Sequence, residues 1–104
     1  MYEEEISDKV SQTLLKTIKL IEKYYEERGN IILNHIRLKQ MYYNARLEIV
    51  DNYILDLLEF KARISNIKYK LDINPNNIRL LQEIDYGEKK INFYENEQSL
   101  NDSA

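Results

Sequence analysis

The sequence has no cysteine and no tryptophan, and it has only two glycines and one proline. The absence of cysteine excludes disulfides, thiolate chemistry and every zinc site that needs sulfur. The scarcity of glycine and proline leaves few positions for tight turns, and valine and threonine, which favour strands, are also sparse. No apolar run approaches the roughly 18 residues of a membrane span. These absences predict an all-helical protein in the cytoplasm.

The chain also lacks an excess of basic charge. Its 15 Lys and Arg residues face 18 Asp and Glu residues, which gives a net charge of −3. A protein held mainly by phosphate contacts is usually basic, so nucleic acid is not the favoured partner. Asparagine, isoleucine, lysine and tyrosine are abundant, as in AT-rich coding sequences, and we expect a source such as a phage, another virus or a mobile element.

Three helices are expected within a single domain spanning residues 1–98. Apolar residues three or four apart predict the first helix over about 5–28, and Gly29 followed by Asn30 predicts a tight connection. Residues 31–71 contain no glycine or proline, and an apolar residue recurs there every seven positions. We expect one long central helix over about 31–71; the alternative is a break near Asp51 and Asn52 that would give four shorter helices. The heptad residues are Ile36, Tyr43, Val50, Leu57, Ile64 and Leu71.

The third helix is expected over about 75–97. Asn74 can cap it and Pro75 can take its first position, where the missing N–H has no cost. Gly87 in its interior costs about 1 kcal/mol relative to alanine and predicts a bend or a close packing contact. Residues 99–104 are expected to form a frayed tail.

Short connections would make neighbouring helices antiparallel. The expected register pairs Val10 with Val50 in the first hairpin and Leu57 with Ile91 in the second. The resulting chain is an elongated coiled coil of two hairpins, each of which buries too little apolar surface by itself. A homodimer would complete the bundle. The expected dimer core consists of Tyr43, Val50, Ile54 and Leu57.

No catalytic, cofactor-binding or metal-binding residues are predicted. His35 is the only histidine, and no carboxylate lies three or four positions away on the same helix face. Nine tyrosines include the doublets Tyr24-Tyr25 and Tyr42-Tyr43, in which only one ring of each pair can face the core. The flanking rings are typical of interface aromatics, so Tyr24 and Tyr42 are candidates for a partner-binding patch.

Cations gather near the end of the predicted long helix. Clustered cations around an aromatic such as Tyr69 can hold a phosphate backbone and stack a base. They do not share one narrow face, and acidic residues of the third helix are expected near them, so salt-bridged surface is the favoured interpretation. The candidate nucleic-acid contacts are Lys61, Arg63, Lys68 and Lys70.

The apolar spacing of "VDNYILDLLEFKARI" resembles the first helix of the helical chorismate mutases, which would imply a helical enzyme acting on a small anion. Lys61 and Asn44 stand where that family has arginines, and the chain is not identified as a member. We instead expect a small non-enzymatic protein that acts through protein–protein interaction, as an oligomeric regulator, adaptor or inhibitor. The alternative is a nucleic-acid-binding or nucleoprotein-binding regulator.

Overall fold

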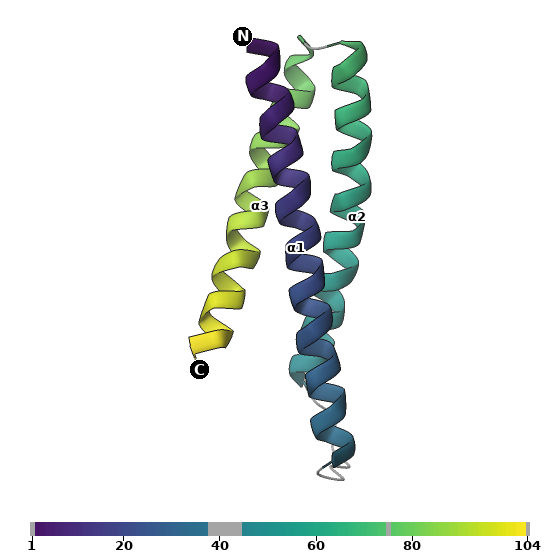
Figure 1. The fold of residues 1–104 in the computed structure, drawn as a ribbon, viewed down its shortest axis with the longest axis vertical. Helices are drawn as coiled ribbons and strands as arrows, with labels where there is room; N and C mark the ends of the chain where they lie inside the picture. The colour runs from purple at the N-terminus through teal and green to yellow at the C-terminus, as the bar shows by residue number, and fades with distance from the viewer. Residues whose placement is uncertain (1, 38–44, 75, 104) are drawn as a thin grey trace.

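A computed structural model describes residues 2–37, 45–74 and 76–103, and in this part of the chain it contains three α-helices and no strand. The helices are α1 (Tyr2–Arg37), α2 (Ala45–Ile73) and α3 (Ile78–Ser103). Figure 1 shows them side by side along one long axis, with α2 antiparallel to the other two. The Cα radius of gyration is 16.8 Å, against about 13 Å for a compact domain of this length, so the expected elongated all-helical fold is confirmed.

The expected turn at Gly29 and Asn30 is wrong, because α1 continues through both residues to Arg37. One exposed glycine costs a helix only about 1 kcal/mol, and tertiary contacts around it outweigh that cost. Just before Gly29, Arg28 pairs with Asp51 at 2.6 Å. Just after Asn30, Ile31 packs against the core. The single helix over 31–71 is therefore not confirmed, since residues 31–37 belong to α1 and α2 begins at Ala45.

The longer α1 changes how the first two helices align. Tyr24 packs on Tyr53 with ring centroids 5.5 Å apart, and Arg28 pairs with Asp51, so the expected pairing of Val10 with Val50 is wrong. In this alignment α1 covers α2 over most of its length and also contacts α3 directly. Lys9 binds Asp85 near one end of the α1–α3 contact, and Tyr24 contacts Tyr94 near the other.

The interior of α2 follows the heptad predicted from the sequence. The helix passes through Asp51 and Asn52 without a break, as expected. Its buried residues face α1 and α3 together and form one core that also takes in Val10, Tyr24 and Ile91. A single three-helix core replaces the two separate hairpins on which the expectation of a dimer rested. The buried residues of α2 are Val50, Ile54, Leu57, Phe60, Ile64, Ile67 and Leu71.

The turn between α2 and α3 lies close to its predicted place, with a different cap. Asn74 closes α2 by donating its N–H to the carbonyl of Lys70, and Asn77 caps α3 by accepting from the N–H groups of Arg79 and Leu80. The observed cap, Asn77, therefore lies three residues after the predicted cap, Asn74. The helix α3 continues to Ser103, beyond the end expected near residue 97.

The register predicted for the second hairpin is confirmed. Placing Leu57 opposite Ile91 puts Asp56 opposite Asn92. In the structure Asp56 binds Lys90 and Tyr94, the two residues on either side of that position. The short turn after Ile73 fixes this register.

Candidate functional site

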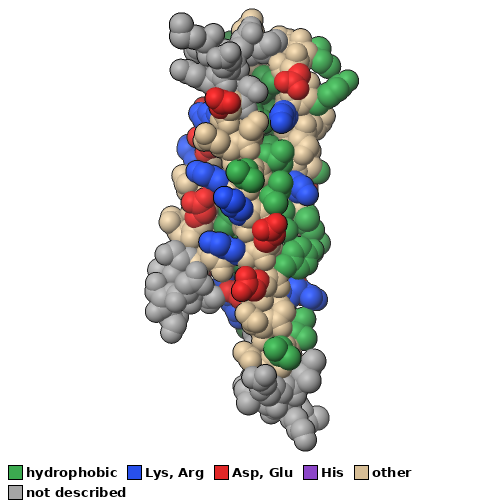
Figure 2. Space-filling view, viewed as in Figure 1, with side chains coloured by type: hydrophobic (Ala, Val, Ile, Leu, Met, Phe, Trp, Pro, Cys, Tyr) green, Lys and Arg blue, Asp and Glu red, His purple; other side chains and the backbone are tan. Residues whose placement is uncertain are grey.

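An apolar stripe runs along the boundary of α1 and α2 on the face turned away from α3. Arg28 and Asp51 pair at one end of this boundary. Residues three or four positions apart lie on the same face of a helix. On this face, beyond the Arg28–Asp51 pair, both helices carry apolar side chains that are partly or largely exposed. Figure 2 shows hydrophobic side chains running lengthwise over this face. We call this set the α1/α2 stripe: Leu14, Leu15, Ile18, Tyr25, Leu55 and Leu58.

Leu55 is 65% exposed and Leu15 is 52% exposed, although both lie in well-formed helices. Single exposed leucines are ordinary, but a contiguous row rimmed by charges marks an interaction surface more often than it marks plain surface. The sequence analysis missed this stripe. Its signal is in "ILDLLEF", where Leu55 and Leu58 add apolar residues beyond those that one buried seam requires.

The charges of α2 are segregated along its axis. Most carboxylates lie in its N-terminal half (Glu48, Asp51, Asp56 and Glu59) and most cations in its C-terminal half (Lys61, Arg63, Lys68 and Lys70). The exceptions are Arg46, which pairs with Glu27 and Glu97, and Asp72 near the C-terminal end. Asp51 and Asp56 are engaged within the chain by Arg28 and Lys90. Glu48, Glu59 and Lys61 are exposed and Lys68 is half-buried, so acidic and basic ends remain at the surface of α2.

A groove separates α2 from α3 on the other flank of α2, with a cavity volume of about 470 Å³. Its apolar lining includes the buried Phe60 and Ile67. The remaining lining residues are polar or aromatic: Arg63, Asn66, Lys70, Glu83 and Tyr86. We call this the α2/α3 groove.

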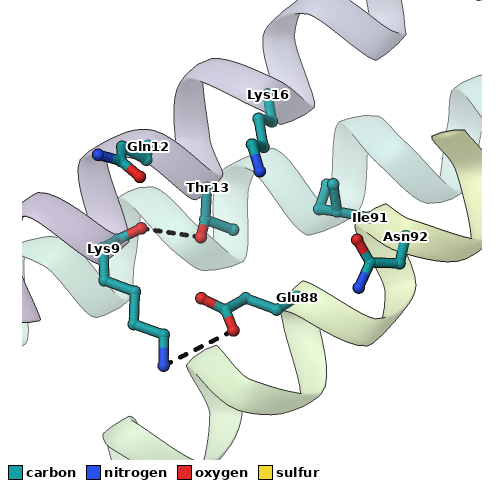
Figure 3. A pocket seen from close by; sticks show the side chains of 7 residues that line it. All are labelled: Lys9, Gln12, Thr13, Lys16, Glu88, Ile91 and Asn92. Atoms are coloured by element: carbon teal, nitrogen blue, oxygen red, sulfur yellow. Dashed lines mark hydrogen bonds and ion pairs between the residues drawn. The ribbon is translucent and has the colours of Figure 1, made fainter.

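A second groove, between α1 and α3, is smaller and is crossed by ion pairs. Its cavity volume is about 240 Å³, and Gln12, Lys16 and Asn92 line it. Figure 3 shows Lys9 and Glu88 reaching toward one another across it, with the nitrogen and carboxylate oxygen 3.6 Å apart. Lys9 also binds Asp85 at 2.9 Å, and this hydrogen bond raises the pKa of Lys9. These pairs join α1 to α3.

A cluster of aromatic and charged side chains joins the three helices. Tyr24 donates a 2.9 Å hydrogen bond to the carbonyl of Tyr94, and Tyr53 packs edge-on against both rings. Tyr94 donates to Asp56, which also accepts from Lys90 at 3.0 Å. The cluster stabilises the packing of α3 on α1 and α2.

The protonation states of this cluster follow from its burial. Burial raises the pKa of Tyr24 and Tyr94 well above the ordinary value, so both phenols keep their protons at neutral pH. Burial by itself would raise the pKa of Asp56, but the hydrogen bonds from Tyr94 and Lys90 outweigh it and hold that pKa below the ordinary value. Asp56 is therefore a carboxylate whose charge supports the fold.

The structure places three of the four predicted dimer-core residues in the core of the single chain. Val50 and Leu57 are fully buried and Ile54 nearly so, because α1 and α3 both cover this part of α2. A second copy could not reach them. Tyr43 lies outside the described residues.

The predicted partner patch is also internal where the structure describes it. Tyr24 is fully buried and hydrogen-bonded, so it is not the exposed ring of its doublet; that ring is Tyr25, which is 48% exposed. Tyr42 lies outside the described residues, and so does the side chain of His35.

The four predicted nucleic-acid contacts divide between two flanks of α2. Arg63 and Lys70 line the α2/α3 groove with Glu83 from α3, whereas Lys61 and Lys68 are not among the groove residues. Arg63 also lies 3.5 Å from Glu59. The expectation that an acidic residue of the third helix would lie near these cations holds for Glu83.

Among residues 2–37, 45–74 and 76–103, no three His, Asp or Glu side chains gather as a metal ion would require. None of the described helices is both long enough and apolar enough to cross a membrane. Comparison of the chain with protein-family models, curated proteins and solved structures finds no match, and its function therefore has to be argued from the surfaces described above.

Proposed function

We propose that this protein acts through protein–protein contact, as a small self-associating helical regulator or adaptor, and that the α1/α2 stripe is its contact surface. The observation that carries the proposal is the contiguous row of partly exposed apolar side chains on the face away from α3. Burial of such a row favours association by roughly 25 cal/mol for each Å² of apolar surface removed from water. The occupant that we propose is a second copy of the chain.

The charge order along α2 supports a second copy in an antiparallel arrangement. When two stripes face each other antiparallel, the acidic half of each α2 lies opposite the basic half of the other. A parallel arrangement would bring like charges together, which is unfavourable. Two copies related by a two-fold axis would bury both stripes in one closed interface.

Sedimentation velocity at about 10 μM, where a micromolar dimer would be substantially formed, tests the proposal. We expect wild-type protein to sediment as a dimer and the Leu55→Glu, Leu58→Glu variant as a folded monomer, because both leucines lie outside the core. Ile78→Glu is the matched control: Ile78 is 70% exposed on α3, away from the stripe, and its substitution should leave the dimer intact.

A charge-swap experiment tests the antiparallel arrangement. Lys61→Glu with Lys68→Glu should weaken the dimer, and so should Glu48→Lys with Glu59→Lys. A mixture of the two doubly substituted proteins should form a heterodimer, since each end of one α2 then meets an end of opposite charge on the other. Wild-type protein that remains monomeric at about 100 μM would refute the proposed dimer. Failure of the mixture to associate would refute the antiparallel arrangement.

A further inference from the structure

The α2/α3 groove combines features that the proposed self-association does not use. It lies on the α3 side of α2, whereas the α1/α2 stripe lies on the α1 side. Its volume of about 470 Å³ falls within the roughly 300–1,000 Å³ of ordinary small-molecule sites. Gly87 contributes to its shape because α3 can approach the ring of Phe60 only where α3 has no side chain.

Two cations lie along one wall of the groove. Arg63 and Lys70 are seven residues apart on α2, which separates their backbone positions by about 10 Å. Glu83 on the opposite wall offsets one of the two charges. The ion pair between Arg63 and Glu59 is largely exposed, and pairs of this kind hold their partners weakly. An incoming anion can therefore replace Glu59 as the partner of Arg63.

An aromatic surface lies beside these cations. Tyr86 lines the groove and is 64% exposed, so its ring can be covered by a flat ligand. Such a stacking contact strengthens binding by about tenfold to a hundredfold per ring. Asn66 adds an amide that can donate to or accept from a polar edge of the same ligand.

From this combination we propose that the α2/α3 groove binds a small aromatic anion, a phosphate or carboxylate joined to a flat ring. Arg63 and Lys70 hold the anionic group, Tyr86 stacks on the ring, and Phe60 and Ile67 supply the apolar surface beneath it. Where the ring carries a hydrogen-bond donor at its edge, Glu83 and Asn66 can accept from it. An extended nucleic-acid strand fits less well, because only two of the four candidate cations line the groove.

Isothermal titration calorimetry with simple probes tests this site. Adenosine monophosphate carries both parts of the ligand, adenosine only the ring, and inorganic phosphate only the anion; phenylacetate presents a carboxylate with a ring. We expect adenosine monophosphate or phenylacetate to bind at least about tenfold more tightly than adenosine and phosphate. The stronger of the two identifies the anion that the groove prefers. Absence of measurable heat with all four probes would overturn the proposal.

Paired substitutions inside and outside the groove test whether the ligand binds there. Arg63→Gln with Lys70→Gln should weaken binding about tenfold or more, whereas Lys61→Gln with Lys68→Gln, which removes the same charge from the same helix outside the groove, should not. Tyr86→Ala should weaken binding and Tyr86→Phe should retain it.

Tyr69 is 66% exposed on α2 and does not line the groove, so Tyr69→Ala is the aromatic control. Equal weakening by both double glutamine variants would overturn the assignment to the groove. Tighter binding of a single-stranded oligonucleotide, lost in both pairs of variants, would point instead to a strand lying along the whole basic half of α2.

Discussion

Gly87 is the residue at which helix propensity and tertiary packing oppose each other most directly. It lies in the interior of α3, and a Cβ atom built on it would lie 2.5 Å from Cζ and 2.9 Å from Cε2 of Phe60. Phe60 is buried, and Lys90 lies over its ring at 5.6 Å from the centroid, so the ring has little room to move. Gly29, in α1, is the opposite case, since no atom of the described residues lies within 4 Å of the Cβ position.

The expected effect of Gly87→Ala is the difference between two contributions. Alanine gains about 1 kcal/mol over glycine in a helix interior, and overpacking a core costs about 1–3 kcal/mol. The net change is a loss of stability of about 1 kcal/mol, which lowers the melting temperature by roughly 4–8 °C in a domain of this size. Gly29→Ala meets no contact and should gain about 1 kcal/mol instead.

A double-mutant cycle with Phe60→Leu, followed by circular dichroism in urea and on heating, separates the two contributions. Leucine removes the outer edge of the ring, so in that background Gly87→Ala should become stabilising, with a coupling of about 2 kcal/mol between the two sites. Gly29→Ala should have the same effect in both backgrounds. A Gly87→Ala variant that is stabilising in the wild-type background, or that shows no coupling to Phe60, would refute the reasoning.

Three further predictions concern polar groups of the core. Because the fold lowers the pKa of Asp56 from its ordinary value of 3.8, the stabilisation by its charge is present above about pH 4 and is lost as the pH falls through the lower folded pKa. Asp56→Asn should therefore reduce the acid sensitivity of the melting temperature, and an unchanged acid profile would contradict this. Tyr24→Phe removes a buried hydrogen bond and should cost about 1 kcal/mol in urea unfolding, while Tyr25→Phe, at a half-exposed ring, should cost nothing measurable. Gln98 is 7% exposed, and its Oε1 atom has no hydrogen-bond partner among the described residues, so Gln98→Met should raise the melting temperature and the exposed Gln82→Met should not.

Part of the fold could be read from local patterns alone. The seven-residue recurrence in α2 identified Val50, Leu57, Ile64 and Leu71 as one face, and all four are buried. The second hairpin was also predictable, because a short turn constrains the alignment of the helices that it joins. Gly87 was recognised as the site of a bend or a close contact, and the approach of Phe60 shows the close contact.

The first hairpin could not be predicted in the same way. A glycine followed by an asparagine is compatible with a turn and with an exposed helical segment, and the two differ locally by about 1 kcal/mol. Tertiary contacts beyond Gly29 favour the helix, in particular the packing of Ile31 against the core. The error then displaced the expected facing pairs and produced the two separate hairpins that a dimer was expected to complete.

The sequence by itself determined the all-helical fold class, the apolar face of α2 and the short turn that makes α3 antiparallel to α2. Each of these depends on residues close together in the chain. Only the tertiary structure decided that α1 runs past Gly29, that three helices share one core, and that Arg63 and Lys70 face Tyr86 across a groove. These features depend on the alignment of segments far apart in sequence. A local pattern constrains such an alignment only where the connection is short, as it is between α2 and α3.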